Sequence, residues 1–446
     1  MKDGAFVKNQ KLKTVAFKTF GCKLNQAETA MMAQDFSACD YTLVNWNASP
    51  DVAVINTCTV TGRADAKCKQ AVRQALRANP QTIVLVTGCM SQASAEEIAL
   101  IEGVDYVLGV SDKLALDSLL PSLEKQFVPR IFVSDIAAQN EVTVHDAGDY
   151  RDQTRAFLKL QSGCDRRCSY CIVPIVRGPS RSLPEEIIIH QFAELVQRDF
   201  KEIVLTGVHV GDYGKDKTGK SELPVLLQKL AQAHPETRIR LSSLDPDDIA
   251  SDLLDVIEMY PNICRHFHIA MQSGSDAILR QMNRRHSTGQ LRNIIDEIIR
   301  TLGCVGLGTD IITGFPGETE KLFLETRQFI QTMPFTYFHV FPFSPRKGTA
   351  AAAMKNQVPP KIRIERADIL RKIGQEKKTA WLHSWVGETA DVLLENRNIQ
   401  GRMGGLTSEY VRVEVPFNKE VINQIVPVRI NQCDSGCCLG ILINAI

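Results

Sequence analysis

The sequence predicts an α/β protein built from three successive domains: a parallel α/β domain, a partial barrel of six strand–helix units, and a small antiparallel β-barrel. Three observations support this prediction. Apolar strands alternate with helices from residue 13 to about 125, and six further strand–helix units lie between residues 156 and about 350. After Gly387 the pattern changes to short alternating strands separated by glycine-marked turns.

The composition is that of an ordinary globular protein. A chain of 446 residues, with 44% hydrophobic and 23% charged residues, can form two or three domains. It has no run of about 18 apolar residues, and its first 13 residues are polar and basic. We therefore expect a cytoplasmic protein with no membrane span and no export signal. In that setting, thirteen cysteines predict metal binding or catalysis rather than disulfides.

The first domain is predicted from four apolar strands, at 14–20, 51–56, 82–87 and 105–108. A helix is expected after the first strand, with Asn25 as its N-cap and Glu28 as the capping partner. This βαβα order predicts a parallel sheet covered by helices, flavodoxin-like in outline. Residues 126–153 are expected to form a linker, with one β-ribbon at 130–133.

Cysteines follow three of these strands at their carboxyl ends, where open parallel sheets bind ligands. Cys22, Cys58 and Cys89 can therefore converge on one metal centre and leave a position on it open. The alternative is three unrelated buried cysteines, because cysteine also packs as a small apolar side chain. Cys39 and Cys68 lack this placement, and we expect both to be structural.

The barrel is predicted from strands at 156–161, 202–206, 238–242, 266–271, 304–312 and 336–341. Its helices are expected at 184–199, 221–233, 247–259, 287–302 and 318–332. Barrels of this kind place their chemistry at the carboxyl ends of the strands. Cys264 and Cys304 lie at the opposite ends, so we expect them to have core or surface roles.

The loop after the first barrel strand carries Cys164, Cys168 and Cys171 at C-x-x-x-C-x-x-C spacing. Thiolates on one short loop can converge on a single soft metal centre without long-range closure. Three ligands are one short of a closed tetrahedral zinc site, and an open position suits catalysis. The alternative is a zinc loop completed by a distant residue such as His190.

A helix at 359–383 leads into the last domain. Residues 361–378 contain seven basic and three acidic residues, which predicts either a solvated face or a surface for phosphate contact. Four strand-like runs follow, at 389–395, 410–415, 425–430 and 439–443, with Gly401, Gly404 and Gly405 marking turns. We expect Cys433, Cys437 and Cys438 to be loop and strand cysteines, with a metal site as the alternative.

The cysteine loop resembles the cluster motif of the radical S-adenosylmethionine (SAM) enzymes, and its flanks at 170–174 and 177–182 resemble the methylthiotransferase branch. The resemblance implies that the three loop cysteines hold a 4Fe–4S cluster whose fourth iron is chelated by SAM. It also implies SAM contacts at the methionine amino group, the ribose and carboxylate, and the adenine. The residues at these positions are Tyr170, Thr206, Gly207, Ser242, Ser243, Asp310 and Gly314. The alternative for the glycines and serines is an ordinary role in turns and caps.

The segments at 19–29, 56–61 and 88–89 resemble the auxiliary-cluster motifs of the same family. The resemblance implies that Cys22, Cys58 and Cys89 hold a second 4Fe–4S cluster, whose free iron carries the sulfur that is transferred. The last domain resembles the TRAM module, an OB-like RNA-binding domain. The implied domains are 11–125 for the auxiliary cluster, 154–378 for radical SAM and 379–446 for TRAM.

The string from Gly21 to Thr29 looks most like the branch that modifies threonylcarbamoyl-adenosine next to the tRNA anticodon. The resemblance implies methylthio transfer to carbon 2 of that adenosine, using two SAM molecules and a cluster-bound sulfur. It also implies two partners: the tRNA anticodon stem–loop, and a low-potential electron donor such as flavodoxin or ferredoxin. The alternatives are methylthiolation of isopentenyladenosine in tRNA, a radical SAM methylase, and a non-enzymatic iron–sulfur protein that binds RNA or senses redox state.

Overall fold

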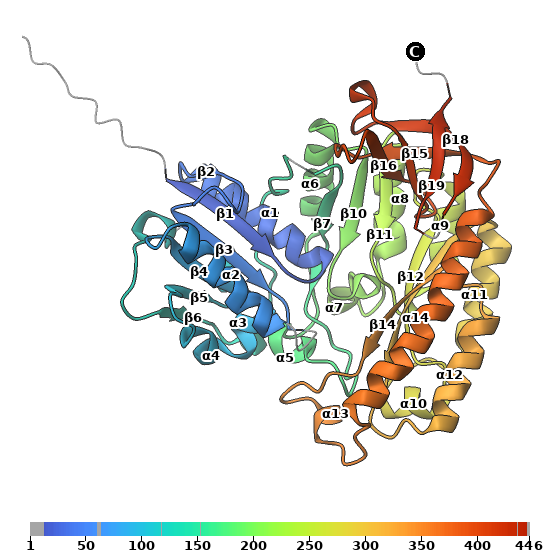
Figure 1. The fold of residues 1–446 in the computed structure, drawn as a ribbon, viewed down its shortest axis with the longest axis horizontal. Coiled ribbons are helices and arrows are strands. Elements are labelled where there is room, and N and C mark those ends of the chain that lie inside the picture. Colours follow the sequence, from blue (N-terminus) through green and yellow to red (C-terminus); the bar gives the residue numbers. More distant parts are fainter. Residues whose placement is uncertain (1–12, 60–63, 117, 152, 435, 444–446) are drawn as a thin grey trace, which may run out of the picture. The chain divides into compact units, whose positions relative to one another are not determined.

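The computed structural model describes residues 13–59, 64–116, 118–151, 153–434 and 436–443 (Figure 1). Two compact units divide the chain, one up to Ile136 and the other from Ala137 onward. In the described residues, no helix is both long enough and apolar enough to cross a membrane.

The first unit is a parallel six-stranded sheet in the order β2-β1-β3-β4-β5-β6, with helices packed on it. Met32 and Phe36 belong to one apolar cluster, together with every second residue of the central strands. Cys68 and Val72 belong to a second cluster, together with the alternate residues of the same strands. The order of the first five strands is that of a flavodoxin-like fold, as predicted. The strands are β1 Thr14–Thr19, β2 Thr42–Leu43, β3 Val52–Thr57, β4 Ile83–Gly88, β5 Tyr106–Leu108 and β6 Arg130–Phe132, and the helices α1 Lys23–Ala38, α2 Ala64–Ala78, α3 Cys89–Ala93 and α4 Ala95–Ala99.

Two local predictions for this unit are wrong. Helix α1 begins at Lys23 with Cys22 as its N-cap, so Asn25 lies inside the helix instead of capping it. The Asn25 amide donates instead to the carbonyls of Phe20 (2.8 Å) and Thr57 (3.0 Å). The strand expected as a ribbon within a linker is β6, which pairs in parallel with β5 at the edge of the sheet.

The second unit contains the predicted partial barrel. Two three-stranded parallel sheets, β7-β10-β11 and β12-β13-β14, are joined by single bridges from Ile239 to Ile263 and from Leu244 to Ile269. The barrel strands are β7 Ala156–Lys159, β10 Glu202–Thr206, β11 Arg238–Leu241, β12 His266–Gln272, β13 Gly306–Thr313 and β14 Tyr337–Pro342. The long helices are α6 Glu185–Gln197, α8 Leu223–Ala233, α9 Ser251–Met259, α11 Thr288–Leu302, α12 Glu320–Thr332 and α14 Pro360–His383. Shorter elements are β8 Gln161–Ser162, β9 Arg181–Ser182, α5 Val173–Arg177, α7 Lys215–Thr218, α10 Asp276–Gln281 and α13 Ala350–Ala353.

A closed five-stranded barrel follows, in the order β15-β16-β17-β19-β18. The strands are β15 Thr389–Leu394, β16 Arg402–Leu406, β17 Arg412–Pro416, β18 Ile425–Cys433 and β19 Cys438–Leu442. Strand β16 was not predicted, because its two central glycines are typical turn residues. At Gly405 a Cβ atom would lie 2.3 Å from the Leu393 carbonyl, so glycine lets the two strands approach. The β17–β19 pair is parallel, not antiparallel as expected throughout.

A disulfide joins Cys433 and Cys438, which face each other across β18 and β19. Both are strand cysteines, as expected, but their disulfide departs from the expectation that the cysteines of this chain serve metal binding or catalysis rather than disulfides. Because the two residues are directly opposite in the β-ladder, the pairing of the strands brings their sulfurs together.

The loop at residues 407–410 closes the amino-terminal end of the partial barrel. Buried Arg240 donates to the carbonyls of Thr407 (2.9 Å) and Ser408 (3.0 Å), and it also binds both carboxylate oxygens of Glu202. The ring of Tyr410 stacks on His266 with 4.4 Å between centroids. The small barrel is therefore part of the structural base of the larger one.

Candidate active site

The cysteine loop begins where β8 ends and is held by close backbone packing. Gly163 has φ +76°, and a Cβ there would lie 1.7 Å from the Pro179 carbonyl. The Cys164 amide donates to the Gly178 carbonyl (3.0 Å), and the Cys171 amide donates to the Cys168 carbonyl (3.0 Å). These bonds fold the loop back on itself at the carboxyl end of the first barrel strand, as predicted.

The three thiols of this loop interact with one another. Burial, and then the nearby sulfurs of Cys168 and Cys164, raise the pKa of Cys171 to about 12. A thiol with such a raised pKa keeps its proton until a metal ion replaces it. His190, the alternative fourth ligand, is exposed on α6 and lies 3.6 Å from Glu194, its ion-pair partner. The donor set is thus three soft sulfurs on one loop, which fits an iron–sulfur cluster with an open position.

A buried charge network surrounds the loop. Arg166, between two of the cysteines, binds Asp247 (2.5 Å) and Asp248 (3.2 Å). His209 lies between Asp212 and Asp248, with a nitrogen 2.5 Å from a carboxylate oxygen of each. Burial by itself would lower the pKa of His209, but these carboxylates raise it to about 12. The imidazolium and the guanidinium therefore neutralise the buried carboxylates of Asp212 and Asp248 and the exposed carboxylate of Asp247 beside the cluster loop.

Arg284 links this network to the cysteines. Its guanidinium binds Asp245 (2.6 Å) and the Ala270 carbonyl (2.8 Å), and Nη1 lies 3.5 Å from the Cys168 sulfur. The guanidinium therefore places a fixed positive charge beside this sulfur. Arg284, His209 and the acidic run at 245–248 were not predicted from the sequence.

The predicted SAM contacts lie around the same edge of the barrel. Thr206 ends β10 and is buried, and Gly207 follows it. Ser242 is half-buried and Ser243 exposed, directly after β11. Gly314 and Tyr170 also lie at this edge. Gly314 follows β13, and half-buried Tyr170 lies in the cysteine loop. Asp310 differs, because it lies inside β13, four residues before Gly314.

In the first unit, the strand-end cysteines lie at the carboxyl ends of three adjacent strands. Cys22 follows β1, Cys58 follows β3 and Cys89 follows β4, and these strands are neighbours in the sheet. A Cβ at Gly21 would lie 2.6 Å from the Cβ of Cys58, so the loop of Cys22 abuts Cys58. The donor set is again three sulfurs at one edge and fits the same kind of centre.

Buried polar side chains hold these loops in place. The Asn56 amide, two residues before Cys58, donates to the Asn25 carbonyl (2.9 Å). Its oxygen accepts from Lys113 (3.3 Å), and Lys113 forms a fully buried ion pair with Glu28 (2.7 Å). The Asn and Glu of the Gly21–Thr29 string are therefore structural supports of the cysteine edge.

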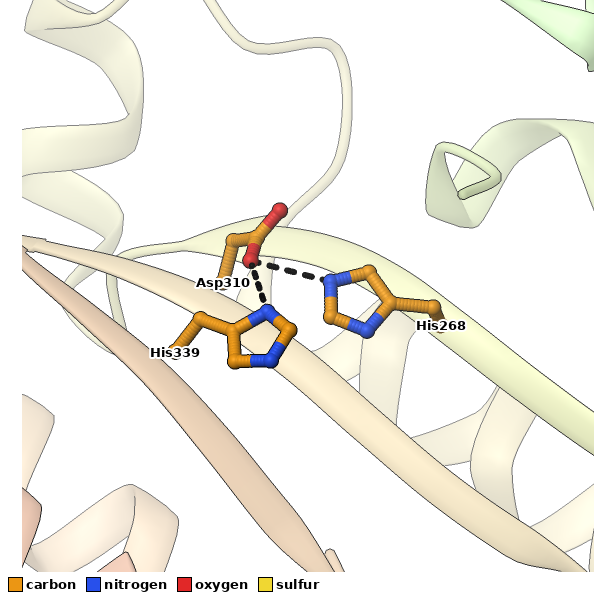
Figure 2. Close-up of side chains that lie close together, drawn as sticks. All are labelled: His268, Asp310 and His339. Carbon is orange, nitrogen blue, oxygen red and sulfur yellow. Dashed lines mark hydrogen bonds and ion pairs between the residues drawn. The ribbon is translucent and has the colours of Figure 1, made fainter. Parts of the chain in front are cut away.

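A further cluster lies on the inner face of β12–β14 (Figure 2). His268 Nε2 and His339 Nδ1 lie 2.9 Å and 3.2 Å from the same carboxylate oxygen of Asp310. Neither histidine was predicted as a site residue. The signal was there in two strands of alternating pattern, His-Phe-His at 266–268 and Tyr-Phe-His at 337–339.

Comparisons with known proteins agree with this arrangement. The family model described as uncharacterized protein family UPF0004 matches residues 14–109, and that of the radical SAM superfamily matches residues 158–330. The threonylcarbamoyladenosine tRNA methylthiotransferase MtaB of Bacillus subtilis (strain 168) is 35% identical over 421 residues, covering 94% of this chain and 93% of its own. The enzyme of the same name from Rickettsia prowazekii (strain Madrid E) is 38% identical over 382 residues, covering 85% and 87%.

Among solved structures, the radical SAM methyltransferase TsrM from Kitasatospora setae, with cobalamin and a [4Fe-4S] cluster bound, has a TM-score of 0.58 at 11% identity. The match covers 88% of this chain and 80% of that one and shows a shared fold. An identity above 30% along nearly the whole chain shows more than a fold. The chain belongs to the radical SAM methylthiotransferase family, closest to its threonylcarbamoyladenosine tRNA branch.

Proposed function

We propose that this protein adds a methylthio group to carbon 2 of threonylcarbamoyl-adenosine next to the tRNA anticodon, using two SAM molecules and a cluster-bound sulfur. The observation that carries the proposal is the pair of cysteine triads, each at the carboxyl ends of parallel strands. One triad suits SAM cleavage, and the other suits delivery of sulfur. The enzyme's relatives carry the same activity in their names.

Each part of the chain has a role in this proposal. Cys164, Cys168 and Cys171 hold the radical SAM cluster, and Cys22, Cys58 and Cys89 hold the auxiliary cluster. When bound, the first cluster supplies the electron that cleaves SAM, and the second supplies sulfur. Segments 11–125, 154–378 and 379–446 act as the auxiliary-cluster, radical SAM and TRAM domains, with 126–153 between the first two.

The protein's own side chains position the reactants and exclude water. Thr206, Gly207, Ser242, Ser243 and Gly314 surround SAM at the strand ends, and Tyr170 packs beside the cysteine loop. Arg284, fixed by Asp245, keeps the sulfur of Cys168 in a positive environment. The buried network of Arg166 and His209 holds the loop rigid, because each cation binds carboxylates on two sides.

Two partners follow from the proposed reaction. tRNA is the substrate, through its anticodon stem–loop, and this places the enzyme in the cytoplasm. Reductive cleavage of SAM also needs a low-potential electron donor, such as flavodoxin or ferredoxin.

The test is mass spectrometry of tRNA nucleosides from cells that lack this protein. We expect loss of the methylthio form of threonylcarbamoyl-adenosine, with its unmethylthiolated precursor accumulating. The wild-type gene should restore the product, and a Cys164→Ala variant should not. Loss of a methylthiolated isopentenyladenosine instead would assign the chain to the other tRNA branch, and unchanged nucleosides would refute the proposal.

A further inference from the structure

From Gly308 toward the carboxyl ends of the strands, the inner face of β12–β14 is partly exposed. Residues of one parity, including Ile269, Ile311 and Val340, are buried, as expected for side chains that face the covering helices. Residues of the other parity face inward and are only partly covered: Ala270, Asp310, Ile312, Tyr337, His339 and Phe341. In a closed core, the side chains on both faces of the sheet would be buried. These partly exposed side chains therefore line a space that solvent can reach.

The floor of this space is closed. A Cβ at Gly308 would lie 2.1 Å from the ring of Tyr337, so the tyrosine lies directly across that glycine. The Tyr337 hydroxyl is fixed by His266 (2.8 Å) and His268 (3.0 Å). Below it, Tyr410 stacks at 5.8 Å from Tyr337. The aromatic floor is therefore rigid, and the open part begins at the level of Asp310 and His339.

The polar end of this space is the carboxylate of Asp310, which His268 and His339 hold in place. Both imidazoles bind Oδ1 of Asp310, whereas Oδ2 has no hydrogen-bond or ion-pair partner among the described residues and points away from both rings (Figure 2). Burial alone would raise the pKa of Asp310, but the hydrogen bonds from His268 and His339 outweigh it and lower the pKa. Asp310 therefore presents an ionised acceptor oxygen to whatever enters.

One side of the space is aromatic. Tyr337, His339 and Phe341 alternate along β14 and so project from the same face. The centroids of Tyr337 and His339 are 5.4 Å apart, and those of His339 and Phe341 are 6.4 Å apart. More than half of the His339 side chain is exposed, at 54%. Enzymes that modify a base commonly stack it on such rings after taking it out of its own stack.

We infer that this inner face is the subsite for the substrate nucleotide, in which the base stacks on His339 and Phe341 and Asp310 reads the threonylcarbamoyl substituent. The inference rests on the proposed function and deepens it. A threonylcarbamoyl group offers ureido N–H donors for the free oxygen of Asp310, and a carboxylate of its own. An isopentenyl group offers neither, and only the N6–H of the adenosine is then left as a donor for Asp310, which is a basis for weaker binding.

Two imidazoles and a carboxylate can also bind a transition metal. The contacts here favour a hydrogen-bonded cluster, because both nitrogens lie within hydrogen-bond distance of one oxygen instead of surrounding a shared centre. The carboxylate and the exposed ring are then available to a nucleotide. The assignment also moves Asp310 away from the SAM contacts, where the family resemblance had placed it.

The test uses the full-length, cluster-loaded protein under anaerobic conditions. Binding of labelled anticodon stem–loop RNA is measured by fluorescence anisotropy, with threonylcarbamoyl-adenosine, isopentenyladenosine or plain adenosine at the modified position. We expect wild type to prefer the threonylcarbamoyl form. Asp310→Asn should reduce that preference about tenfold, since a hydrogen bond to a charged group is lost. His339→Ala, at an exposed position, should weaken binding of every stem–loop by removing a stacking ring.

The matched controls are Asp296→Asn and His190→Ala, at exposed positions on α11 and α6. Both should behave as wild type. Circular dichroism and iron content check that each variant is folded and loaded. If wild type shows the preference and modifies tRNA, but Asp310→Asn and His339→Ala leave binding unchanged, the subsite is wrong and the proposed function stands.

If wild type neither prefers the threonylcarbamoyl form nor modifies it, the proposed function fails together with the subsite. Loss of SAM affinity in Asp310→Asn with an intact RNA preference would return Asp310 to the SAM site and overturn the inference. Tight binding of Zn²⁺ or Fe²⁺ by the loaded wild type, lost in His339→Ala without any change in RNA binding, would identify the cluster as a metal site.

Discussion

The Glu28–Lys113 ion pair shows how single residues support the cysteine edge of the first unit. Both side chains are fully buried, and Lys113 also binds Asn56. Lys113→Met leaves the Glu28 carboxylate buried without its cation, which should cost about 3–5 kcal/mol of stability. We expect native-state hydrogen exchange of β3 and β4 to accelerate accordingly.

The matched double variant, Glu28→Gln with Lys113→Met, removes both charges and should recover much of that loss. Equal destabilisation in the single and the double variant would show that packing, rather than charge pairing, holds this edge together.

His286 gives the second unit a pH dependence. It is buried, and its Nε2 donates to the Met271 carbonyl (3.2 Å). Burial and then the charge of Arg284 lower its pKa to about 4. Because this value lies below the unfolded value of about 6.5, the unfolded chain takes up the proton at a higher pH than the folded chain does. Lowering the pH therefore favours the unfolded chain. The stability associated with neutral His286 is full above about pH 6.5 and is lost toward about pH 4.

We therefore expect the unfolding free energy of this unit to fall by about 3 kcal/mol between about pH 7 and pH 4 from this residue alone. His286→Gln should remove that part of the slope. Denaturant titrations at several pH values, followed by near-UV circular dichroism, provide the measurement. A slope that is the same in the variant would mean that another group titrates in this range.

At the scale of elements, hydrophobic periodicity predicted most strands and helices within a few residues, because the barrel strands are buried on the helix side and the helices have one apolar face. It failed where other forces decide. The β16 strand is held by close backbone approach at Gly405, and glycine has no side chain to produce a period. The edge strand β6 was predicted as a ribbon in a linker and not as part of the sheet, because it is exposed along its whole length and carries no alternating pattern.

The basic helix α14 illustrates a limit of counting charges. Arg363 and Arg366 are buried: Arg363 donates to the carbonyls of Val358 and Phe343, and Arg366 forms an ion pair with Glu318 at 2.8 Å. They hold the helix on the barrel and are not available to phosphate. Lys372 is exposed and lines a groove along the helix with Gln375, Glu376, Thr379, Ala380 and His383.

We expect Lys372→Ala to weaken tRNA binding and to reduce the log–log salt slope by about 0.7–0.9, the value for one phosphate contact. Anisotropy titrations at several salt concentrations measure this slope. Lys220→Ala, which removes an exposed lysine after α7, is the matched control and should leave the slope unchanged. If the two variants behave alike, α14 does not touch the phosphates.

At the scale of the whole molecule, the order of three folds was predictable because each has its own period and its own turn residues. The placement of both cysteine triads at strand ends followed from the same patterns. The contacts that fix these sites were not predictable, because they join residues distant in sequence: Arg284 with Cys168, Lys113 with Glu28, and His268 with Asp310. The base of the barrel, where Arg240 binds the 407–410 loop, was unpredictable for the same reason.

The division into two units makes a quantitative prediction about iron. Each triad lies within one unit and is held by that unit's own backbone contacts, so each cluster should form without the other. Anaerobic reconstitution of the full chain should give about eight iron per chain, from two four-iron clusters.

Replacing Cys164, Cys168 and Cys171 with Ala should leave about four iron and abolish SAM cleavage. Replacing Cys22, Cys58 and Cys89 should also leave about four iron but retain 5′-deoxyadenosine formation, with no methylthiolated product. Cys304→Ala, at an exposed cysteine before β13, is the control and should keep all of the iron. An unchanged iron content in the Cys22, Cys58 and Cys89 variant would show that the strand-end sulfurs hold no cluster, and the sulfur for the reaction would then have to come from elsewhere.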